Sequence, residues 1–188
     1  MNAQGGGTYI QIAEDALAYF RCAITELNYQ FYGLSKYSKL EDVQIGQAVE
    51  HYAVGLDRLK KYTADQDPGR IIQPMGFVAV NIQVDGSENV YIMLNERDGK
   101  WQSTSLGQEY YSQAFIDLQR NSDFGEEVSL VRVPGLNLAY ASTVIDEVLH
   151  LIPLQIGDEQ TKDNEPRPAA EVFEELSRLI DDGEDVPR

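Results

Sequence analysis

Apolar residues at the start of the chain recur with the period of an α-helix. Thr8 with Gln11 has the pattern of a capping box, and Gly33 suits the left-handed residue that ends a helix. Between these signals the apolar positions are spaced alternately by three and four, which predicts one amphipathic helix over residues 8–34. The stripe consists of Ile10, Ala13, Leu17, Phe20, Ile24, Leu27, Phe31 and Leu34.

A second helical period follows over residues 40–64. Ser38 and Glu41 fit another capping box, and the apolar positions after them are again spaced by four and three. These positions are Ile45, Val49, Tyr52, Leu56 and Leu59. Because the connection between the two segments is short, we expect them to pack as an antiparallel helical hairpin.

The period changes from helical spacing to alternation after residue 70. Residues 75–84 alternate, with Val78, Val80 and Ile82 on the more apolar face, and Asp98-Gly99 is a hairpin turn signal. The other elements predicted here are strands over 89–95, 100–105, 127–133, 136–140 and 148–152 and a helix over 105–120. These patterns indicate an antiparallel sheet of about five strands with one crossing helix.

The end of the chain reads as a polar linker followed by a last helix. Residues 155–167 are almost entirely polar, and Pro168 suits the first position of a helix. The overall prediction is an α+β fold, with the helical hairpin packed on the sheet and a C-terminal amphipathic helix on the linker. We expect a single α+β domain over 1–154 (8–64 the hairpin, 71–154 the sheet with one helix), the linker over 155–167, and the helix with an acidic tail over 168–188.

The charge of the chain narrows the classes of partner. The formal net charge is −16, with 31 acidic and 15 basic residues, which argues against nucleic acid and against an anionic membrane surface. Residues 1–70 carry 7 basic and 9 acidic residues, whereas 71–154 and 155–188 each carry 4 basic and 11 acidic residues. With no signal-peptide pattern and no long apolar run, we expect a cytoplasmic location.

Metal and cofactor motifs are missing from the sequence. One cysteine and two histidines give no ligand pair with zinc spacing, and neither a Walker sequence nor a dinucleotide fingerprint occurs. We therefore expect no metal and no cofactor. Cys22 lies beside the apolar stripe of the first helix, so we expect a buried, inert thiol.

The candidate catalytic residues are His150, Asp146 and Glu147. A histidine oriented by a carboxylate is the arrangement of a general base, and these three lie within five positions of the chain. Such spacing is common, so the alternative is an exposed or structural histidine. His51 falls beside the apolar positions of the second helical segment, and we interpret it as a boundary residue.

Tyrosine is the least ordinary part of the composition, with 11 Tyr against 6 Phe. Its apolar ring and polar tip favour interfaces, so the candidate ligand or partner surface consists of Tyr29, Tyr32, Trp101 and Tyr140. We therefore favour a non-enzymatic protein-binding module whose partner is a basic protein or a second copy, through the hairpin or the last helix. The alternative is a small-ligand-binding protein or hydrolase-like enzyme, with a pocket between sheet and hairpin that uses His150, Asp146 and Glu147.

Overall fold

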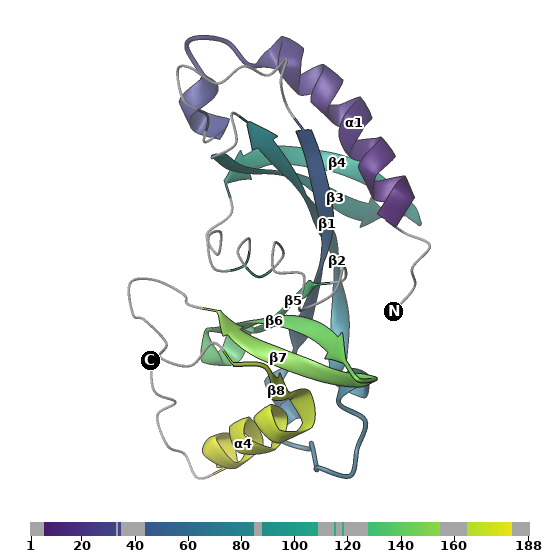
Figure 1. Ribbon diagram of the computed structural model, residues 1–188, viewed down its shortest axis with the longest axis vertical. Coiled ribbons are helices and arrows are strands. Elements are labelled where there is room, and N and C mark those ends of the chain that lie inside the picture. Colours follow the sequence, from purple (N-terminus) through teal and green to yellow (C-terminus); the bar gives the residue numbers. More distant parts are fainter. Residues whose placement is uncertain are drawn as a thin grey trace. The chain divides into compact units, whose positions relative to one another are not determined.

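The computed structural model describes residues 6–32, 34, 44–84, 88–108, 115, 118, 128–154 and 165–181. Its strands are hydrogen-bonded in the order β4-β3-β2-β1-β5-β6-β7-β8 (Figure 1). β1 and β5 pair in parallel, whereas the pairings of β2 through β4 and of β5 through β8 are antiparallel, so the sheet is mixed. The chain divides into two compact units, one of residues 1–50 and 76–112 and the other of residues 51–75 and 113–188.

The elements of the two units are as follows. Unit 1 contains α1 (Gly6–Ala23), the 3₁₀ turn η1 (Tyr29–Tyr32), the larger parts of β1 (Gln44–Val54) and β2 (Ile72–Val84), β3 (Glu88–Arg97) and β4 (Lys100–Gln108). Unit 2 contains the remaining parts of β1 and β2, α2 (Leu56–Leu59), η3 (Pro68–Arg70), β5 (Ser129–Val133), η5 (Pro134–Leu136), β6 (Leu138–Ile145), β7 (Val148–Leu154), β8 (Arg167–Pro168) and α4 (Ala169–Asp181).

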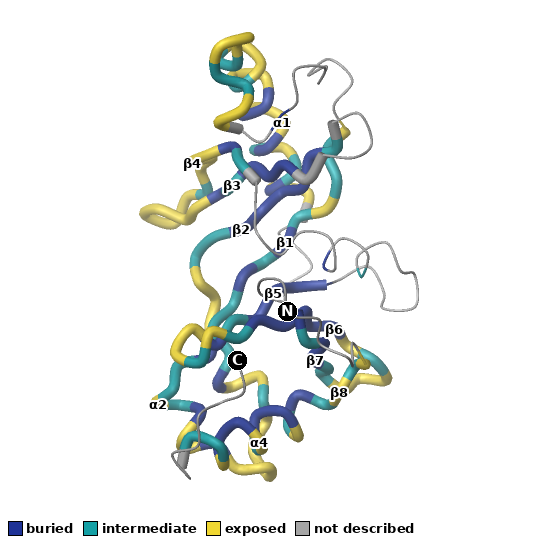
Figure 2. The backbone as a smooth tube through the Cα atoms, turned by 90° about the vertical axis from the view of Figure 1, so that its left-hand side faces the viewer, coloured by how far each residue is buried: buried dark blue, intermediate teal, exposed yellow. Residues whose placement is uncertain are grey.

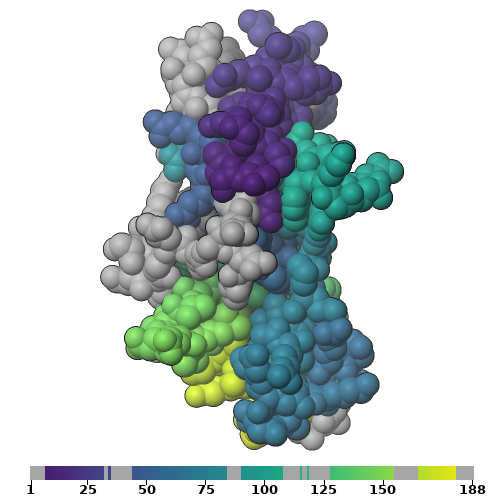
Figure 3. Space-filling view, turned by 90° about the vertical axis from the view of Figure 1, so that its right-hand side faces the viewer, coloured from purple at the N-terminus to yellow at the C-terminus, as the bar shows by residue number. Residues whose placement is uncertain are grey.

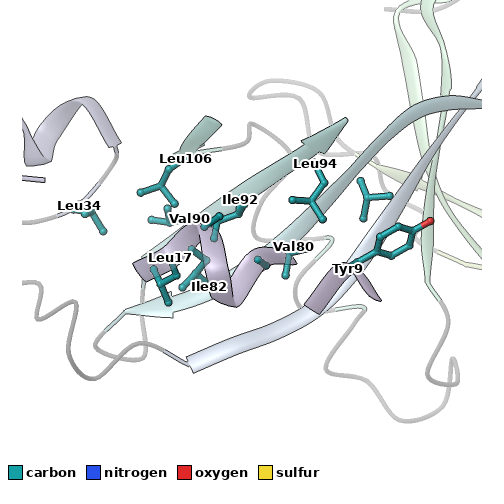
Figure 4. Close-up of a cluster of buried hydrophobic side chains, with 12 residues drawn as sticks. Tyr9, Leu17, Leu34, Val80, Ile82, Val90, Ile92, Leu94 and Leu106 are labelled. Carbon is teal, nitrogen blue, oxygen red and sulfur yellow. The ribbon is translucent and has the colours of Figure 1, made fainter. Parts of the chain in front are cut away.

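In unit 1, α1 covers one face of the sheet (Figure 1). Val80 pairs with Ile92 across β2 and β3, Ile92 pairs with Leu106 on β4, and all three are buried against the apolar stripe of α1 (Figure 4). At the start of β4, Trp101 meets Tyr9 of α1 edge to face, with ring centroids 5.0 Å apart. The alternation predicted for β2 and β3 therefore forms this core.

In unit 2, α4 packs against β7 and β8. Its Phe173 is fully buried and meets Tyr62 edge to face at 5.7 Å, and Val131 and Leu151 of the sheet belong to the same cluster. A helix of this length is marginal in water by itself, so docking on the sheet is what stabilises it. The predicted last helix and its apolar stripe are thereby confirmed.

The predicted helical hairpin is wrong, and with it the predicted fold class. Residues 44–54 form β1 rather than the middle of a helix, and of the described residues 44–64 only Leu56–Leu59 is helical. Gly46 and Gly55 weaken a helix by about 1 kcal/mol each, whereas as a strand this segment pairs with β5 at His51, Tyr52 and Ala53. A Cβ atom on Gly46 would lie 3.5 Å from Asn81 of the next strand, an ordinary contact distance, so the position is packed but does not itself require glycine.

The first helix is also shorter than predicted. It ends at Ala23, and the side chain of Asn28 then makes two hydrogen bonds to the preceding backbone. Its Oδ1 accepts from the Thr25 N–H at 2.6 Å, and its Nδ2 donates to the Ala23 carbonyl at 2.9 Å. Asparagine competes with the helix for these backbone groups. The predicted stripe therefore stops before Leu27 and Phe31.

Other local predictions can be compared directly. The Asp98-Gly99 turn has the predicted left-handed geometry, with φ of 54° and 73°. Ser105 and Gln108, expected to open a helix, belong to β4 instead; Phe115 and Leu118 are helical, and the rest of that segment lies outside the described residues. Residues 148–152 form a strand as predicted, while most of the linker at 155–167 lies outside the described part. A single domain over 1–154 stays a prediction.

Candidate functional site

The three catalytic candidates do not form an oriented acid–base group. Asp146 and Glu147 are the exposed central residues of the β6–β7 turn, with φ of 49° and 65°. His150, half-buried on β7, has its Nδ1 atom 2.9 Å from the carbonyl oxygen of Val148, to which the Nδ1–H tautomer donates. The main chain, rather than either carboxylate, therefore orients this side of the ring.

The aromatic candidates are divided between the two units. Tyr29 is half-buried in η1, where its hydroxyl accepts from the Gln30 side chain at 3.2 Å. Tyr32 also lies in η1, with its side chain outside the described part, and Trp101 packs into the core of unit 1. Tyr140 is buried in unit 2, where burial first and Glu175 second raise its pKa to about 12.

The pocket expected between the sheet and the helical hairpin lacks the second helix that was to form one of its sides. Residues 44–54, which were to form the second helix, are a strand of the sheet itself. Trp101 and Tyr29 belong to unit 1, whereas Tyr140 and His150 belong to unit 2. The candidates named from the sequence are therefore not gathered within either unit.

The structure shows instead three exposed large apolar residues on unit 1: Tyr19, Leu27 and Phe31. Their exposed fractions are 72%, 93% and 85% (Figure 2 shows the exposed backbone at the end of α1). Single exposed apolar residues are ordinary, but three large ones within thirteen positions are not. We refer to these three residues as the apolar surface.

A hydrogen-bonded turn holds the apolar surface in place. The Thr25 carbonyl accepts from the backbone N–H groups of Asn28 and Tyr29, both at 3.1 Å, and the Thr25 hydroxyl accepts from the Leu27 N–H at 3.3 Å. The Phe31 N–H donates to the Asn28 carbonyl at 3.0 Å. Leu27 and Phe31 are thus exposed on a turn of fixed conformation.

On α1 and the turn after it, which carry the apolar surface, the exposed charges are mostly negative. Glu14, Asp15 and Glu26 are exposed on α1 and the following turn, against one exposed cation, Arg21. Cys22 is exposed beside them, so the expectation of a buried thiol is wrong. The cause is that α1 turns its outer face to solvent at this position.

The spacing of apolar residues does not predict the apolar surface. Leu27 and Phe31 continue the spacing of the helix stripe, which is why they were assigned to the core. The available signal was Thr25 together with Asn28, because both residue types favour turns over helix interiors. A helix ending at residue 23 would have left both apolar residues without a core to enter.

Strand β4 is a second unusual feature of unit 1. It pairs with β3 on one side, and it is the terminal strand among those the structure describes. Gln102, Ser103, Thr104 and Ser105 are exposed, while Leu106 anchors the strand in the core. η1, which carries Phe31, contacts β4 within unit 1.

His51 is the most deeply buried ionisable side chain of unit 2. It lies on β1 opposite Leu130 and is 1% exposed. Burial first and the Arg132 charge second lower its pKa from 6.5 to about 3, so it is neutral at physiological pH. A side chain so enclosed is a structural group rather than a surface acid or base.

The described residues contain no group of three or more His, Cys, Asp or Glu side chains placed to hold a metal ion. Among those same residues, each helix is too short or too polar to cross a membrane. No protein-family model, curated protein or solved structure matches the chain.

Proposed function

We propose that the protein is a non-enzymatic protein-binding module whose partner contacts the apolar surface. The observation that carries the proposal is the exposure of Leu27 and Phe31, 93% and 85%, on a turn fixed by Asn28. Aromatic residues are enriched at interfaces, where their burial supplies most of the binding free energy. A pre-formed turn also lowers the entropy that binding must overcome.

The charges around the apolar surface define the kind of partner. Exposed Glu14, Asp15 and Glu26 outnumber Arg21, and the chain as a whole carries −16. We therefore infer a protein with an apolar recess surrounded by basic side chains, which would be attracted electrostatically. The exposed free thiol of Cys22 supports a reducing, cytoplasmic location.

The test compares two variants, each with two apolar residues replaced by serine. Leu27→Ser/Phe31→Ser removes most of the apolar surface, and Val144→Ser/Val148→Ser removes the half-exposed valines of the β6–β7 hairpin. The immobilised wild type and both variants are presented to extract from the native host, and captured proteins are quantified by mass spectrometry at low and high salt.

The expected result is a basic protein captured by the wild type and the valine variant, lost from the Leu27/Phe31 variant, and weakened by salt. Equal capture by all three proteins would exclude the apolar surface as the binding site. Capture lost only with the valine variant would place the binding site on unit 2 instead.

A further inference from the structure

The outer edge of β4 carries backbone groups that could pair with another strand. β3 uses one side of β4 over eight residue pairs, from Val90–Gln108 to Arg97–Lys100. In the described structure the strand order ends at β4, and Figure 3 shows the β3–β4 segment in teal projecting beside α1. An unpaired edge of this length is a template for strand addition.

The sequence of β4 lacks most of the devices that protect edges. From Trp101 to Gln108 it contains neither a charged residue nor a proline. The opposite edge of the sheet, β8, has only two residues, and Pro166 and Pro168 remove backbone donors there. The protection that β4 does have is a bulge at Thr104, whose hydroxyl donates to the Met93 carbonyl at 3.2 Å.

The bulge determines which residues of β4 share a face. Trp101 and Leu106 both pack on the α1 side, although five positions separate them. Gln102 and Ser105 pair with Asn95 and Met93 of β3, so these two share the opposite face. An antiparallel copy of β4 therefore keeps its faces matched when Gln102 lies opposite Ser105 of the copy.

We propose that β4 is a self-association edge, at which the β4 strands of two copies pair antiparallel about a twofold axis between Ser103 and Thr104. Trp101 then lies opposite Leu106 of the second copy, and the apolar cores beneath α1 become continuous. Lys100 lies opposite Gly107 of the second copy, so no like charges meet along the edge. Symmetric pairing of this kind uses one surface patch twice.

A second copy is favoured over a different protein because the edge is complementary to itself. From Trp101 to Gln108 the strand is uncharged and matches its own copy, whereas the basic partner proposed for the apolar surface requires acidic residues. The two interactions also differ in salt dependence. Two chains of −16 repel each other, so salt should strengthen self-association while it weakens binding of a basic protein.

Charge substitutions at the proposed opposing pair test the pairing. In Gln102→Lys/Ser105→Lys, two pairs of lysines lie opposite across the edge, which should weaken the dimer about tenfold or more. Gln102→Lys/Ser105→Glu places opposite charges there and should restore it. Gln11→Lys/Gln66→Lys adds the same charge at exposed sites outside β3 and β4 and serves as the control. Sedimentation equilibrium over a concentration series at two salt levels measures the dissociation constants.

Disulfide trapping tests the register independently. In a Cys22→Ser background, Gln102→Cys/Ser105→Cys should give a covalent dimer on mild oxidation, because three positions along one strand are too far apart for an intrachain bond. Asn95→Cys/Gln102→Cys pairs across β3 and β4 within one chain and should oxidise without dimer.

The outcomes separate this proposal from the proposed function. A dimer lost in Gln102→Lys/Ser105→Lys but kept in Leu27→Ser/Phe31→Ser supports pairing through β4. The reverse pattern would assign self-association to the apolar surface and overturn the β4 proposal. A wild-type chain that is monomeric at every concentration and salt level would overturn it as well, and would leave binding of a basic partner intact.

Discussion

The two units differ in how they end their strands and where they place large apolar side chains. Among the described strands unit 1 ends in β4, nine residues long and uncharged after Lys100, and it exposes Leu27 and Phe31. Unit 2 ends in β8, which has two residues and continues directly into α4, whose Phe173 is fully buried. In the described structure its most exposed large apolar residues are the half-exposed Val144 and Val148 at one hairpin tip, followed by Met75.

This difference indicates a division of roles between the units. Prolines at Pro166 and Pro168 remove edge donors, and the helix that follows them uses its apolar stripe inside unit 2. Unit 1 also packs a helix on a sheet face, but its described residues lack these terminators. On the two proposals above, unit 1 offers to partners the kinds of apolar residue and backbone donor that unit 2 uses internally.

The prediction with the largest expected effect compares the stability of two variants in which a phenylalanine is replaced by alanine. Phe173→Ala empties a buried site against Tyr62 and should lower the free energy of unfolding by about 3–5 kcal/mol. Phe31→Ala, at 85% exposure, should change it by less than about 0.5 kcal/mol. Urea unfolding followed by circular dichroism measures both. A large loss with Phe31→Ala would mean that this ring is part of the core and not of a binding surface.

The second prediction uses pH, because both histidines belong to unit 2. The pKa of His51 is lowered from 6.5 to about 3 in the folded state, so between these values the unfolded chain binds the proton preferentially. Stability is therefore retained above pH 6.5 and lost as pH falls. Between pH 7 and pH 5 the loss should be about 2 kcal/mol, at about 1.4 kcal/mol per unit.

Urea unfolding of His51→Gln and His150→Gln isolates this contribution. The His51 variant should lose the slope of stability against pH that His51 causes, while the His150 variant retains it because His51 is still present. If both variants keep the wild-type slope, the pKa of His51 in the folded protein is close to its ordinary value and its surroundings are not as closed as the structure shows.

How much the sequence could predict also differs between segments. Alternation with Asp98-Gly99 identified β2, β3 and the start of β4, and Pro168 with its apolar stripe identified α4, because local pattern and tertiary environment agree there. Residues 44–54 were misassigned because their apolar residues also fit helical spacing, and the pairing of β1 with a distant strand, β5, decides the conformation.

The candidate site was harder to predict than the fold. Leu27 and Phe31 fit the stripe of a longer helix, and only the hydrogen bonds of Asn28 reveal that the helix ends before them. Whether β4 lies at the edge depends on the order of strands in the sheet, and the spacing of apolar residues does not predict that order. His150, by contrast, was recognisable by residue type, but its bond to the Val148 carbonyl was not.

The third prediction concerns the turn that presents the apolar surface. Asn28→Ala removes the hydrogen bonds to the Thr25 N–H and the Ala23 carbonyl, so it should lower the free energy of unfolding by about 1–2 kcal/mol. Gln30→Ala removes one exposed bond to Tyr29 and should cost little. Amide exchange at Thr25 and partner capture are the measurements. Unchanged exchange in Asn28→Ala would show that the turn is held by its backbone bonds alone.

The smallest expected effect compares the hairpin turns of the two units. Gly99 in unit 1 and Glu147 in unit 2 occupy equivalent left-handed positions, with φ of 73° and 65°, which glycine adopts with less strain than glutamate. Glu147→Gly should therefore stabilise the protein by about 0.5–1 kcal/mol, and Gly99→Ala should destabilise it by a similar amount. Urea unfolding decides both. If Glu147→Gly instead destabilises the protein, the Glu147 side chain makes an interaction that outweighs the backbone strain. Because Glu147 is one of the catalytic candidates, that result would support a functional role for it.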